Sequence, residues 1–299
     1  MLLFIGLPII SSFFQSLHIE PEQILMEVEK CDPFGCKTET KVDIEATTKL
    51  QEEQPLGRFN GLGTYGDRNH LAFDEIKEAW TNSSSIAEFT DILLNLPFYK
   101  ALLFTLTFCF AVTPPVVVLG FIVALSVNTI TKSLKGPTIF GVILPMIVTP
   151  LIGSLVLFWM IDAKGILGSF IQFLFDDPNL SLKSSSQLTW ITLIIYGIWH
   201  NTPFAFVVFY AALQTVPQDP IEAAIIDGAS RYERVRHIVI PHLYPVATFI
   251  ILICLMDNFR VLEPIIGFAA EGVAQSLSWM IYNDLRSENK MLFLSLIHI

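Results

Sequence analysis

Long apolar runs separated by short polar segments dominate this chain. Four runs come near or exceed the roughly 20 apolar residues that a helix needs to cross a bilayer: residues 101–127, 138–161, 188–213 and 246–267. A run at the beginning, residues 1–19, is just long enough, and one at the end, residues 291–299, is too short. The pattern predicts an all-α, polytopic membrane helix bundle of about six spans, of which the first and last are expected to be incomplete.

The charges of the connecting loops predict which side of the membrane each loop faces. Residues 128–137 contain Lys132 and Lys135 and no acidic residue, and short loops rich in lysine and arginine stay on the cytoplasmic side. Counting crossings from there places residues 162–187, which read as polar, outside. The same count returns residues 214–245 to the cytoplasmic side.

The composition agrees with a membrane protein. Hydrophobic residues make up 53% of the chain and charged residues 15%, whereas soluble domains contain about 25% charged residues. Residues 20–100 carry 16 acidic and 8 basic side chains, and so account for −8 of the net charge of −10. We expect this acidic segment to lie outside the membrane as a small or partly flexible domain. The negative balance also speaks against nucleic acid as a partner.

The four cysteines fall into two pairs with different expected roles. Cys31 and Cys36, in C-D-P-F-G-C, are separated by turn-forming residues and would close a small disulfide on an oxidising side of the membrane. Cys109 and Cys254 lie in apolar runs and are interpreted as small core residues. Two neighbouring thiols are too few for a structural zinc site, so no metal site is predicted.

The polar segment between the last two long runs begins with signals for a short helix. Asp219 is predicted to cap this helix, Pro220 suits the first helical position, and Glu222 stands where a capping box places a carboxylate. Gly228 can adopt the left-handed conformation that ends such a helix.

A second short helix is predicted to follow directly. Ser230 and Glu233 repeat the S-x-x-E start signal, and Pro241 is expected to stop the helix. Three alanines leave parts of the surface with side chains no larger than a methyl group, which would let another protein approach the backbone: Ala223, Ala224 and Ala229. The local chemistry alone leaves two interpretations open, a docking element and a capped membrane loop.

The residues of this segment carry a family resemblance. They are Glu222-Ala223-Ala224, Asp227-Gly228-Ala229, Ile238, Pro241 and Pro245, preceded by Tyr210, Leu213 and Pro217. This pattern resembles the E-A-A loop of permease subunits in bacterial binding-protein-dependent ABC importers, on the sugar-permease branch that includes maltose and glycerol-phosphate systems. One departure is Val235, where a phenylalanine is usual.

The resemblance implies a fold, a domain layout and a set of partners. The fold would be that of a type I ABC importer permease, with a first span over residues 1–19, a periplasmic segment over 20–100 and a permease domain over 101–299. Residues 214–245 would couple the chain to ABC ATPase subunits in the cytoplasm. The residues expected to make this coupling are Glu222, Ala223, Ala224, Asp227, Gly228, Ala229 and Pro241. Further implied partners are a second permease subunit, a periplasmic solute-binding protein, membrane lipid and a sugar substrate.

Catalytic motifs are missing from the sequence. It contains no G-x-x-x-x-G-K-[ST], no H-E-x-x-H and no G-x-S-x-G. The chain is therefore not expected to be an enzyme, to bind ATP itself or to hold a cofactor.

Polar residues interrupt the fourth and fifth long apolar segments. Ionisable groups at membrane depth are costly and usually face a bundle interior or a watery cavity. We interpret the following residues as lining a translocation path for a polyhydroxylated solute: Trp199, His200, Asn201, Phe204, Asp257, Asn258 and Arg260. Asp257, Arg260 and Glu263 recur every three residues and are predicted to pair along one side of a helix. The alternative is a structural network that joins helices.

These observations favour a multi-pass permease subunit in the bacterial cytoplasmic (inner) membrane that carries a sugar or related polyol. Two alternatives remain open. One is the same machinery for another solute such as glycerol phosphate. The other is a membrane scaffold or sensor subunit whose loop docks a partner other than an ATPase.

Overall fold

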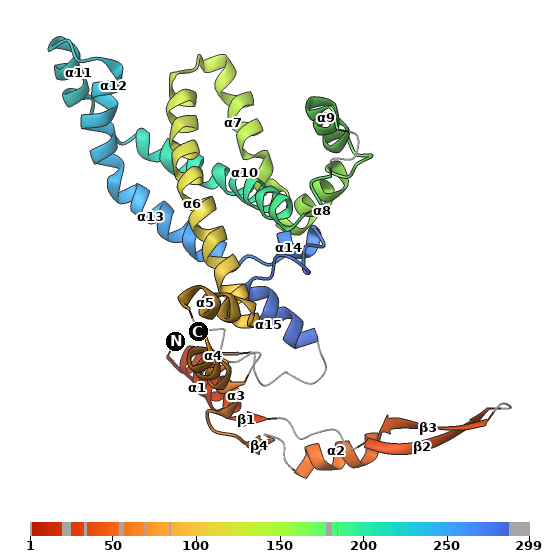
Figure 1. Cartoon of the computed structure of the whole chain (residues 1–299). Coiled ribbons are helices and arrows are strands. Elements are labelled where there is room, and N and C mark those ends of the chain that lie inside the picture. Colours follow the sequence, from red (N-terminus) through yellow and green to blue (C-terminus); the bar gives the residue numbers. More distant parts are fainter. Residues whose placement is uncertain are drawn as a thin grey trace. The chain divides into compact units, whose positions relative to one another are not determined.

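The computed structural model describes residues 2–19, 25–32, 35–53, 57–67, 70–83, 85–177, 181–183 and 185–286 (Figure 1). The chain divides into two compact units, one of residues 1–100 and 280–299 and the other of residues 101–279. Each unit is described by itself below.

The first unit combines short helices with two small antiparallel ribbons. Its helices are α1 (Leu2–Ser16), α2 (Ile44–Glu53), α3 (Gly63–Gly66), α4 (Phe73–Asn82) and α5 (Ile86–Asn95). The ribbons pair β1 (His18–Ile19) with β4 (Arg58–Phe59), and β2 (Leu25–Asp32) with β3 (Gly35–Val42). The strands were not predicted from the sequence, whereas the predominance of helix was and is confirmed.

The β2–β3 hairpin brings the first two cysteines of the chain opposite each other along the backbone. Its register pairs Cys31 with Cys36 next to the turn. The side chains of these two residues lie outside the described part of the chain, so the disulfide stays a prediction.

The second unit is built from helices. They are α6 (Pro97–Thr129), which enters this unit at residue 101, α7 (Lys132–Ile147), α8 (Pro150–Met160), α9 (Ile166–Phe175), α10 (Ser186–Leu213), α11 (Gln218–Ile226), α12 (Arg231–Arg234), α13 (Ile240–Phe259) and α14 (Glu263–Gly267). Helix α15 (Leu277–Arg286) begins in this unit, and its residues 280–286 belong to the first. A π-helical segment, Val235–Val239, joins α12 to α13. Helices α6 and α10 match the predicted spans over residues 101–127 and 188–213.

Within the residues that the structure describes, three helical stretches are long and apolar enough to cross a membrane. They are Pro97–Thr129, Ser186–Leu213 and Arg231–Phe259, and the bent pair α7 and α8 makes a fourth candidate. The predicted fifth span over residues 246–267 was misplaced, because the helix begins earlier and ends at Phe259. The predicted short run at residues 291–299 lies outside the described residues.

The third predicted span is two helices rather than one. Helices α7 and α8 meet at an angle of 95°. Val148 and Thr149 between them are extended, with ψ angles of 127° and 144°. A residue before proline is pushed away from the helical region, and Pro150 then starts α8 where no N–H is needed. The predicted third span over residues 138–161 is thus broken between α7 and α8, and the bent pair remains a candidate for one span.

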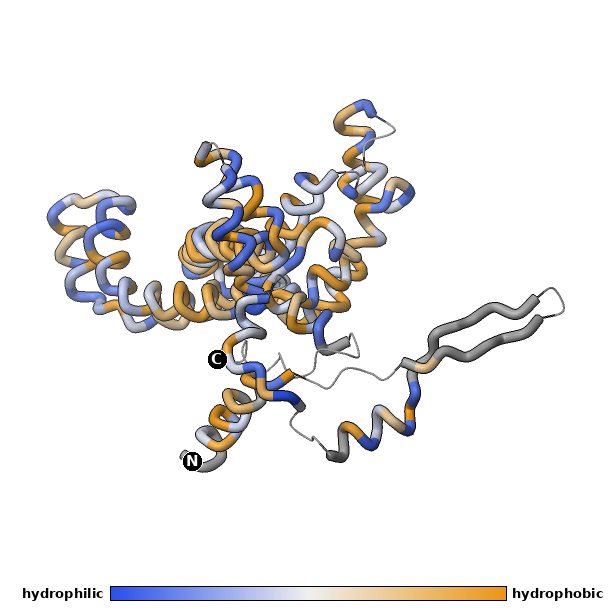
Figure 2. Tube along the Cα trace, turned by 60° about the horizontal axis from the view of Figure 1, so that its bottom comes forward, coloured by the Kyte–Doolittle hydropathy of each residue, from blue (hydrophilic) through white to orange (hydrophobic). Residues whose placement is uncertain are grey.

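The core of the second unit lies between α6, α10 and α13. The largest buried side chains include Phe104, Phe206, Leu193, Tyr196 and Ile250. Apolar residues extend well beyond this core along the helices, whereas the tip formed by α11 and α12 mixes apolar and hydrophilic residues (Figure 2). Large apolar surfaces that remain uncovered are typical of segments that contact lipid or other proteins.

Helices α6 and α10 approach closely at a glycine. A Cβ added to Gly120 would lie 2.5 Å from the Cβ of Ala205 and 3.0 Å from the backbone nitrogen of Phe206. Small residues of this kind let the backbones of membrane helices pack tightly.

We expect Gly120→Ala to lower the free energy of unfolding by about 1–3 kcal/mol, because the added methyl overpacks a contact with backbone atoms. The matched control is Gly141→Ala in α7, where an added Cβ meets nothing within 4 Å. Replacing this helical glycine should stabilise the protein by about 0.5–1 kcal/mol. Unfolding of the purified chain in mixed detergent micelles measures both. Equal stability of the two variants would contradict the packing described here.

Candidate functional site

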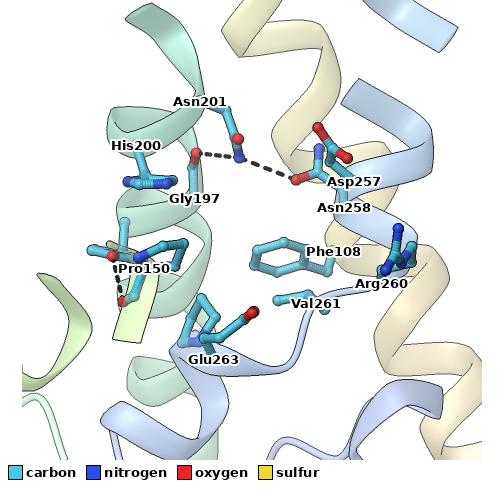
Figure 3. A pocket seen from close by; sticks show the side chains of 12 residues that line it. Phe108, Pro150, Gly197, His200, Asn201, Asp257, Asn258, Arg260, Val261 and Glu263 are labelled. Atoms are coloured by element: carbon cyan, nitrogen blue, oxygen red, sulfur yellow. Dashed lines mark hydrogen bonds between the residues drawn. The ribbon is translucent and has the colours of Figure 1, made fainter. Parts of the chain in front are cut away.

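A polar cavity of about 340 Å³ lies inside the second unit, where α10, the end of α13 and the start of α14 come together (Figure 3). It is lined by Phe108, Pro150, Tyr196, Gly197, His200, Asn201, Asp257, Asn258, Arg260, Val261, Glu263 and Pro264. We call it the interspan cavity.

Most of the predicted path residues meet in this cavity. Those that line it are His200, Asn201, Asp257, Asn258 and Arg260. Two segments that are more than 50 residues apart in sequence thus contribute polar groups to one space.

Trp199 and Phe204 lie elsewhere. Trp199 is 47% exposed and lines a separate apolar cavity between α6, α7 and α10. Phe204 is half-buried and packs against the hydrophobic core. Trp199 is adjacent in sequence to His200 but projects from a different side of α10, since neighbouring helical residues do not share a face. The structure therefore does not bring these two residues to the interspan cavity.

Asn258 joins three helices. Its Nδ2 donates to Thr113 Oγ1 of α6 at 3.1 Å, and its Oδ1 accepts from Asn201 Nδ2 of α10 at 3.2 Å. Asn201 Nδ2 also donates to the carbonyl oxygen of Gly197 at 2.9 Å. Only 2% of Asn258 is exposed, and a buried amide needs such partners. For these two asparagines, the geometry supports the structural network that was the alternative interpretation.

Asp257, Arg260 and Glu263 do not form the predicted row along one helix. Helix α13 ends at Phe259, where Arg260 caps it with φ −93° and ψ 18°, and Glu263 begins α14. The amide of Arg260 bonds the Asp257 carbonyl at 3.2 Å, a tight last turn that closes the helix. These three residues, all in the described part of the chain, make no ion pair with one another. They line the interspan cavity instead.

Sequence reasoning missed six of the residues that line the cavity, namely Phe108, Pro150, Tyr196, Gly197, Val261 and Pro264. Tyr196 donates its hydroxyl to the Pro150 carbonyl oxygen at 2.8 Å, and its ring stacks on His200 with centroids 5.7 Å apart. Tyr196 precedes His200 by four residues, so helical periodicity could have identified it. Phe108 comes from α6 and Pro150 from α8, and no local pattern relates either to the polar residues.

The Nδ1 atom of the His200 imidazole is buried and has no hydrogen-bond partner within the described residues. Such an atom is costly unless water or a ligand reaches it. His200 is therefore suited to meet a polar group that enters the cavity.

The loop between α10 and α13 has two of the predicted capping features. Gly228 has φ +78° after α11, the left-handed conformation expected for it. Ser230 and Glu233 form a capping box, in which the Ser230 amide donates to Glu233 Oε2 at 2.7 Å and the Glu233 amide donates to Ser230 Oγ at 3.3 Å. These two local predictions are confirmed.

Two other predictions about this loop were wrong. Asp219 does not cap α11, since Pro217 occupies the cap position without a side-chain bond and Asp219 lies in the first turn. Pro241 does not stop the second helix, because the π-helical segment carries it into α13 and Pro241 falls in the first turn there. Pro241 therefore stands within one helical stretch, Arg231–Phe259, directly after the π-helical segment, and both proline and π turns interrupt the regular hydrogen-bond ladder of an α-helix.

The loop presents an apolar surface among polar residues. Of the predicted coupling residues, Glu222, Ala223, Asp227, Gly228 and Pro241 are exposed, and Ala224 and Ala229 are half-buried. Beside them Ile225 is 52%, Ile226 86% and Tyr232 68% exposed. Exposed apolar side chains that gather among polar residues are a common feature of interaction surfaces.

Among the described residues, no group of three or more histidine, cysteine, aspartate or glutamate side chains is arranged to hold a metal ion.

Comparison with known proteins identifies relatives of the chain. Residues 94–262 match the model of a family described as binding-protein-dependent transport system inner membrane component. The chain is 34% identical over 115 residues to the trehalose/maltose transport system permease protein MalF of Thermococcus litoralis, covering 35% of this chain and 39% of that protein. It is 26% identical over 210 residues to the sn-glycerol-3-phosphate transport system permease protein UgpA of Yersinia enterocolitica, covering 68% of each. The alignment to the first of these relatives thus spans well under half of its length.

Solved structures share the fold. A chain in the crystal structure of a bacterial ABC transporter involved in the import of the acidic polysaccharide alginate is similar, with a TM-score of 0.62 over 86% of this chain and 91% of that chain. A second structure of the alginate transporter, in complex with an alginate pentasaccharide-bound periplasmic protein, has a TM-score of 0.57 over 76% and 81%. Sequence identity is 18% in both cases, so the likeness supports the fold alone.

We expect Asn258→Ala to lower the free energy of unfolding by about 1–3 kcal/mol, because it leaves the buried groups of Thr113 and Asn201 without their partner. Asp257→Ala is the matched control, since Asp257 is the preceding residue and is exposed to the cavity. It should change stability by about 0.5 kcal/mol or less. Unfolding in mixed micelles compares the two, and a larger loss for Asp257→Ala would contradict the roles assigned here.

Proposed function

The chain belongs to the family of binding-protein-dependent transport system inner membrane components, and from this premise we propose that it is the permease subunit of an ABC importer for a sugar or related polyol. The relatives named above are permeases for trehalose or maltose and for glycerol phosphate. Each of these solutes is a small polyhydroxylated molecule. The multi-pass arrangement of apolar helices agrees with a protein of the bacterial inner membrane.

The interspan cavity is the observation that carries the proposal. Its volume of about 340 Å³ lies within the range of about 300–1,000 Å³ that is typical of small-molecule sites. Asp257 and Glu263 offer carboxylate oxygens that accept from hydroxyl groups, and Arg260 offers donors. The rings of Phe108 and Tyr196 supply apolar faces of the kind against which a sugar ring packs. The cavity therefore has the chemistry to hold a hydroxylated solute between the spanning helices.

The charges of the cavity favour a neutral solute over a phosphate ester. Two carboxylates, Asp257 and Glu263, share the cavity with one guanidinium, that of Arg260. A phosphate would need several cationic donors in place of these acids. We therefore propose a sugar or polyol without a phosphate group.

The loop between α10 and α13 indicates the protein partners of the chain. We propose that residues 214–245 face the cytoplasm and dock on an ABC ATPase, with Ile225, Ile226 and Tyr232 entering its surface beside Glu222. The capping box at Ser230 holds the loop as a preformed element, which reduces the ordering cost of docking. A second permease subunit and a periplasmic solute-binding protein would complete the importer. The chain itself carries out no covalent chemistry in this proposal.

A scaffold or sensor role is less well supported. The named relatives are transport permeases. A scaffold role would also leave the interspan cavity and its polar lining unexplained. Purification in mild detergent separates the two functions, since an importer brings an ATPase and a second permease with it. Recovery of the chain with neither would favour the scaffold.

The loop is tested by Glu222→Lys and Gly228→Pro in the importer reconstituted with its ATPase and solute-binding protein. Both should reduce solute-stimulated ATP hydrolysis and uptake by about tenfold or more, the effect of losing a central interface contact. The first variant places a lysine where the docking surface has an acid, and the second removes the left-handed turn. The control is Asp74→Lys, the same charge change at an exposed residue of α4. Full activity in both loop variants would refute the docking role.

The cavity is tested by Asp257→Asn, which removes a charged acceptor. Its hydrogen bond to a solute hydroxyl is worth about 1.5–3 kcal/mol, so the apparent affinity for the solute should fall roughly tenfold to a hundredfold. Trp199→Phe is the control, because Trp199 does not line this cavity. Uptake of radiolabelled sugar into proteoliposomes over a range of concentrations measures both. A stronger effect of the tryptophan variant would place the solute elsewhere.

A further inference from the structure

Helix α9 carries a large uncovered apolar surface. It lies in the segment that the sequence predicted to be polar, yet eight of its ten residues are apolar or glycine, the exceptions being Ser169 and Gln172. Ile166 is 78%, Phe170 59% and Phe173 83% exposed. These three residues follow the helical repeat and so share one face. The proposed solute path and the coupling loop leave this face without a role.

The orientation of α9 is built into the fold. Gly165 and Gly168 lie so close to the end of α8 that a Cβ on either would overlap backbone oxygens, those of Trp159 and Met160 for Gly165 and that of Asp162 for Gly168. The amide of Gly165 also donates to the Asp162 carbonyl at 2.7 Å. This corner turns the glycine side of α9 toward α8, which Figure 1 shows beside it, and the aromatic face outward.

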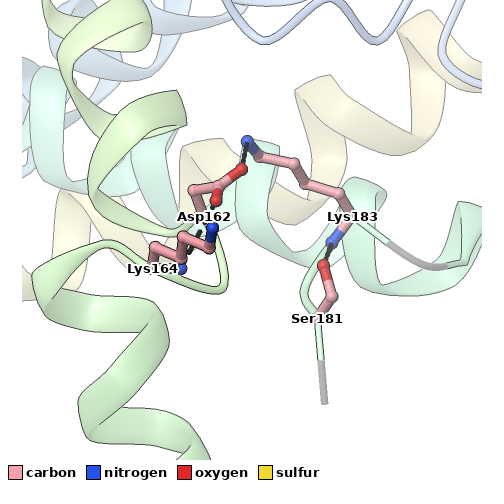
Figure 4. A network of polar contacts seen from close by, with 4 residues as sticks. All are labelled: Asp162, Lys164, Ser181 and Lys183. Atoms are coloured by element: carbon pink, nitrogen blue, oxygen red, sulfur yellow. Dashed lines mark hydrogen bonds and ion pairs between the residues drawn. The ribbon is translucent and has the colours of Figure 1, made fainter. Parts of the chain in front are cut away.

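Charged groups gather at the base of α9. Lys183 Nζ lies 3.1 Å from Asp162 Oδ2 (Figure 4). It also lies 3.3 Å from the centroid of the Phe158 ring. The hydrogen bond from Lys183 is the main cause that holds the pKa of Asp162 below its ordinary value, so the carboxylate stays charged at neutral pH. Asp162 precedes α9 and Lys183 follows it. The ion pair therefore closes the polypeptide loop that carries the helix.

Helix α8, which precedes α9, also exposes large apolar side chains. Ile152, Val156 and Trp159 of α8 are between 52% and 65% exposed, and α8 belongs to a helix pair apolar enough to count as a broken span. Ten residues of helix are only about 15 Å long, half of the hydrocarbon core of a bilayer, so α9 cannot cross it. An apolar helix with charged groups at its base suits the boundary between headgroups and acyl chains.

We propose that α9 is an interfacial anchor, which buries Ile166, Phe170 and Phe173 in one leaflet while the Asp162–Lys183 pair stays at the headgroup level. The partner is membrane lipid. This inference rests on the membrane placement in the proposed function. It goes beyond that function because it assigns a lipid contact to a segment outside the spans.

Spin labels on the full-length chain in phosphatidylcholine and phosphatidylglycerol vesicles test the anchor. Phe170→Cys and Phe173→Cys are made in a background whose native cysteines are replaced by serine. The references are Phe110→Cys, at a position 67% exposed within α6, and Asp219→Cys, at an exposed position of the polar loop. For each spin label, the experiment measures the ratio of its accessibility to molecular oxygen over its accessibility to a nickel reagent in the water. If α9 is inserted, this ratio should be about fivefold or more higher at both α9 sites than at Asp219, because molecular oxygen is apolar and concentrates among acyl chains.

The references separate failure of the anchor from failure of the proposed function. If Phe110 gives a lipid-like ratio while both α9 labels resemble Asp219, the anchor is refuted and the permease proposal stands. Labels on α9 that are shielded from both oxygen and nickel would show that protein covers the face, which also refutes the lipid contact. A water-like ratio at Phe110 would refute the membrane placement on which both proposals rest. Elution as a single peak in gel filtration confirms that each labelled variant is folded.

Discussion

A buried amide in an apolar bundle must find its partners inside the bundle, and Asn258 meets this requirement by joining three helices. Its bonds to Thr113 and Asn201 tie α13 to α6 and α10 at the depth of the interspan cavity. Leaving such a group without partners is costly, so the three helices are held in one register. The positions of Asp257 and Arg260 depend on that register, because they flank Asn258 in sequence. The same interaction that stabilises the bundle thus sets the polar wall of its cavity.

The break between α7 and α8 supplies the other side of this cavity. Because the chain turns by 95° there, Pro150 comes within reach of Tyr196, whose hydroxyl bonds its carbonyl oxygen. Ser154 of α8 donates to the carbonyl oxygen of Glu263 at 3.4 Å and so approaches α14. A continuous third helix would carry Pro150 away from α10 and Ser154 away from α14. A local effect of proline on its neighbour therefore shapes the polar site.

The sequence was informative where a feature depends on neighbouring residues. Apolar length predicted the helices α6 and α10, and the S-x-x-E signal predicted the capping box at Ser230, since both are local properties. The sequence was not informative where contacts between segments far apart in the chain determine the structure. Phe108 reaches the cavity from α6, and Trp199 turns away from it, because packing selects which sides of the helices meet. The apolar helix α9 was missed because flanking charges made the whole segment read as polar. The functional roles of the loop and cavity residues remain proposals.

The continuity of the chain from α12 through the π-helical segment into α13 has a mechanical consequence. Arg231–Phe259 is one helical stretch of 29 residues, or about 43 Å at 1.5 Å per residue. Its first turn belongs to the exposed loop, and its last turn carries Asp257 and Asn258 beside the cavity. In the proposed importer, a tilt imposed at the loop would be carried along this stretch to the cavity wall.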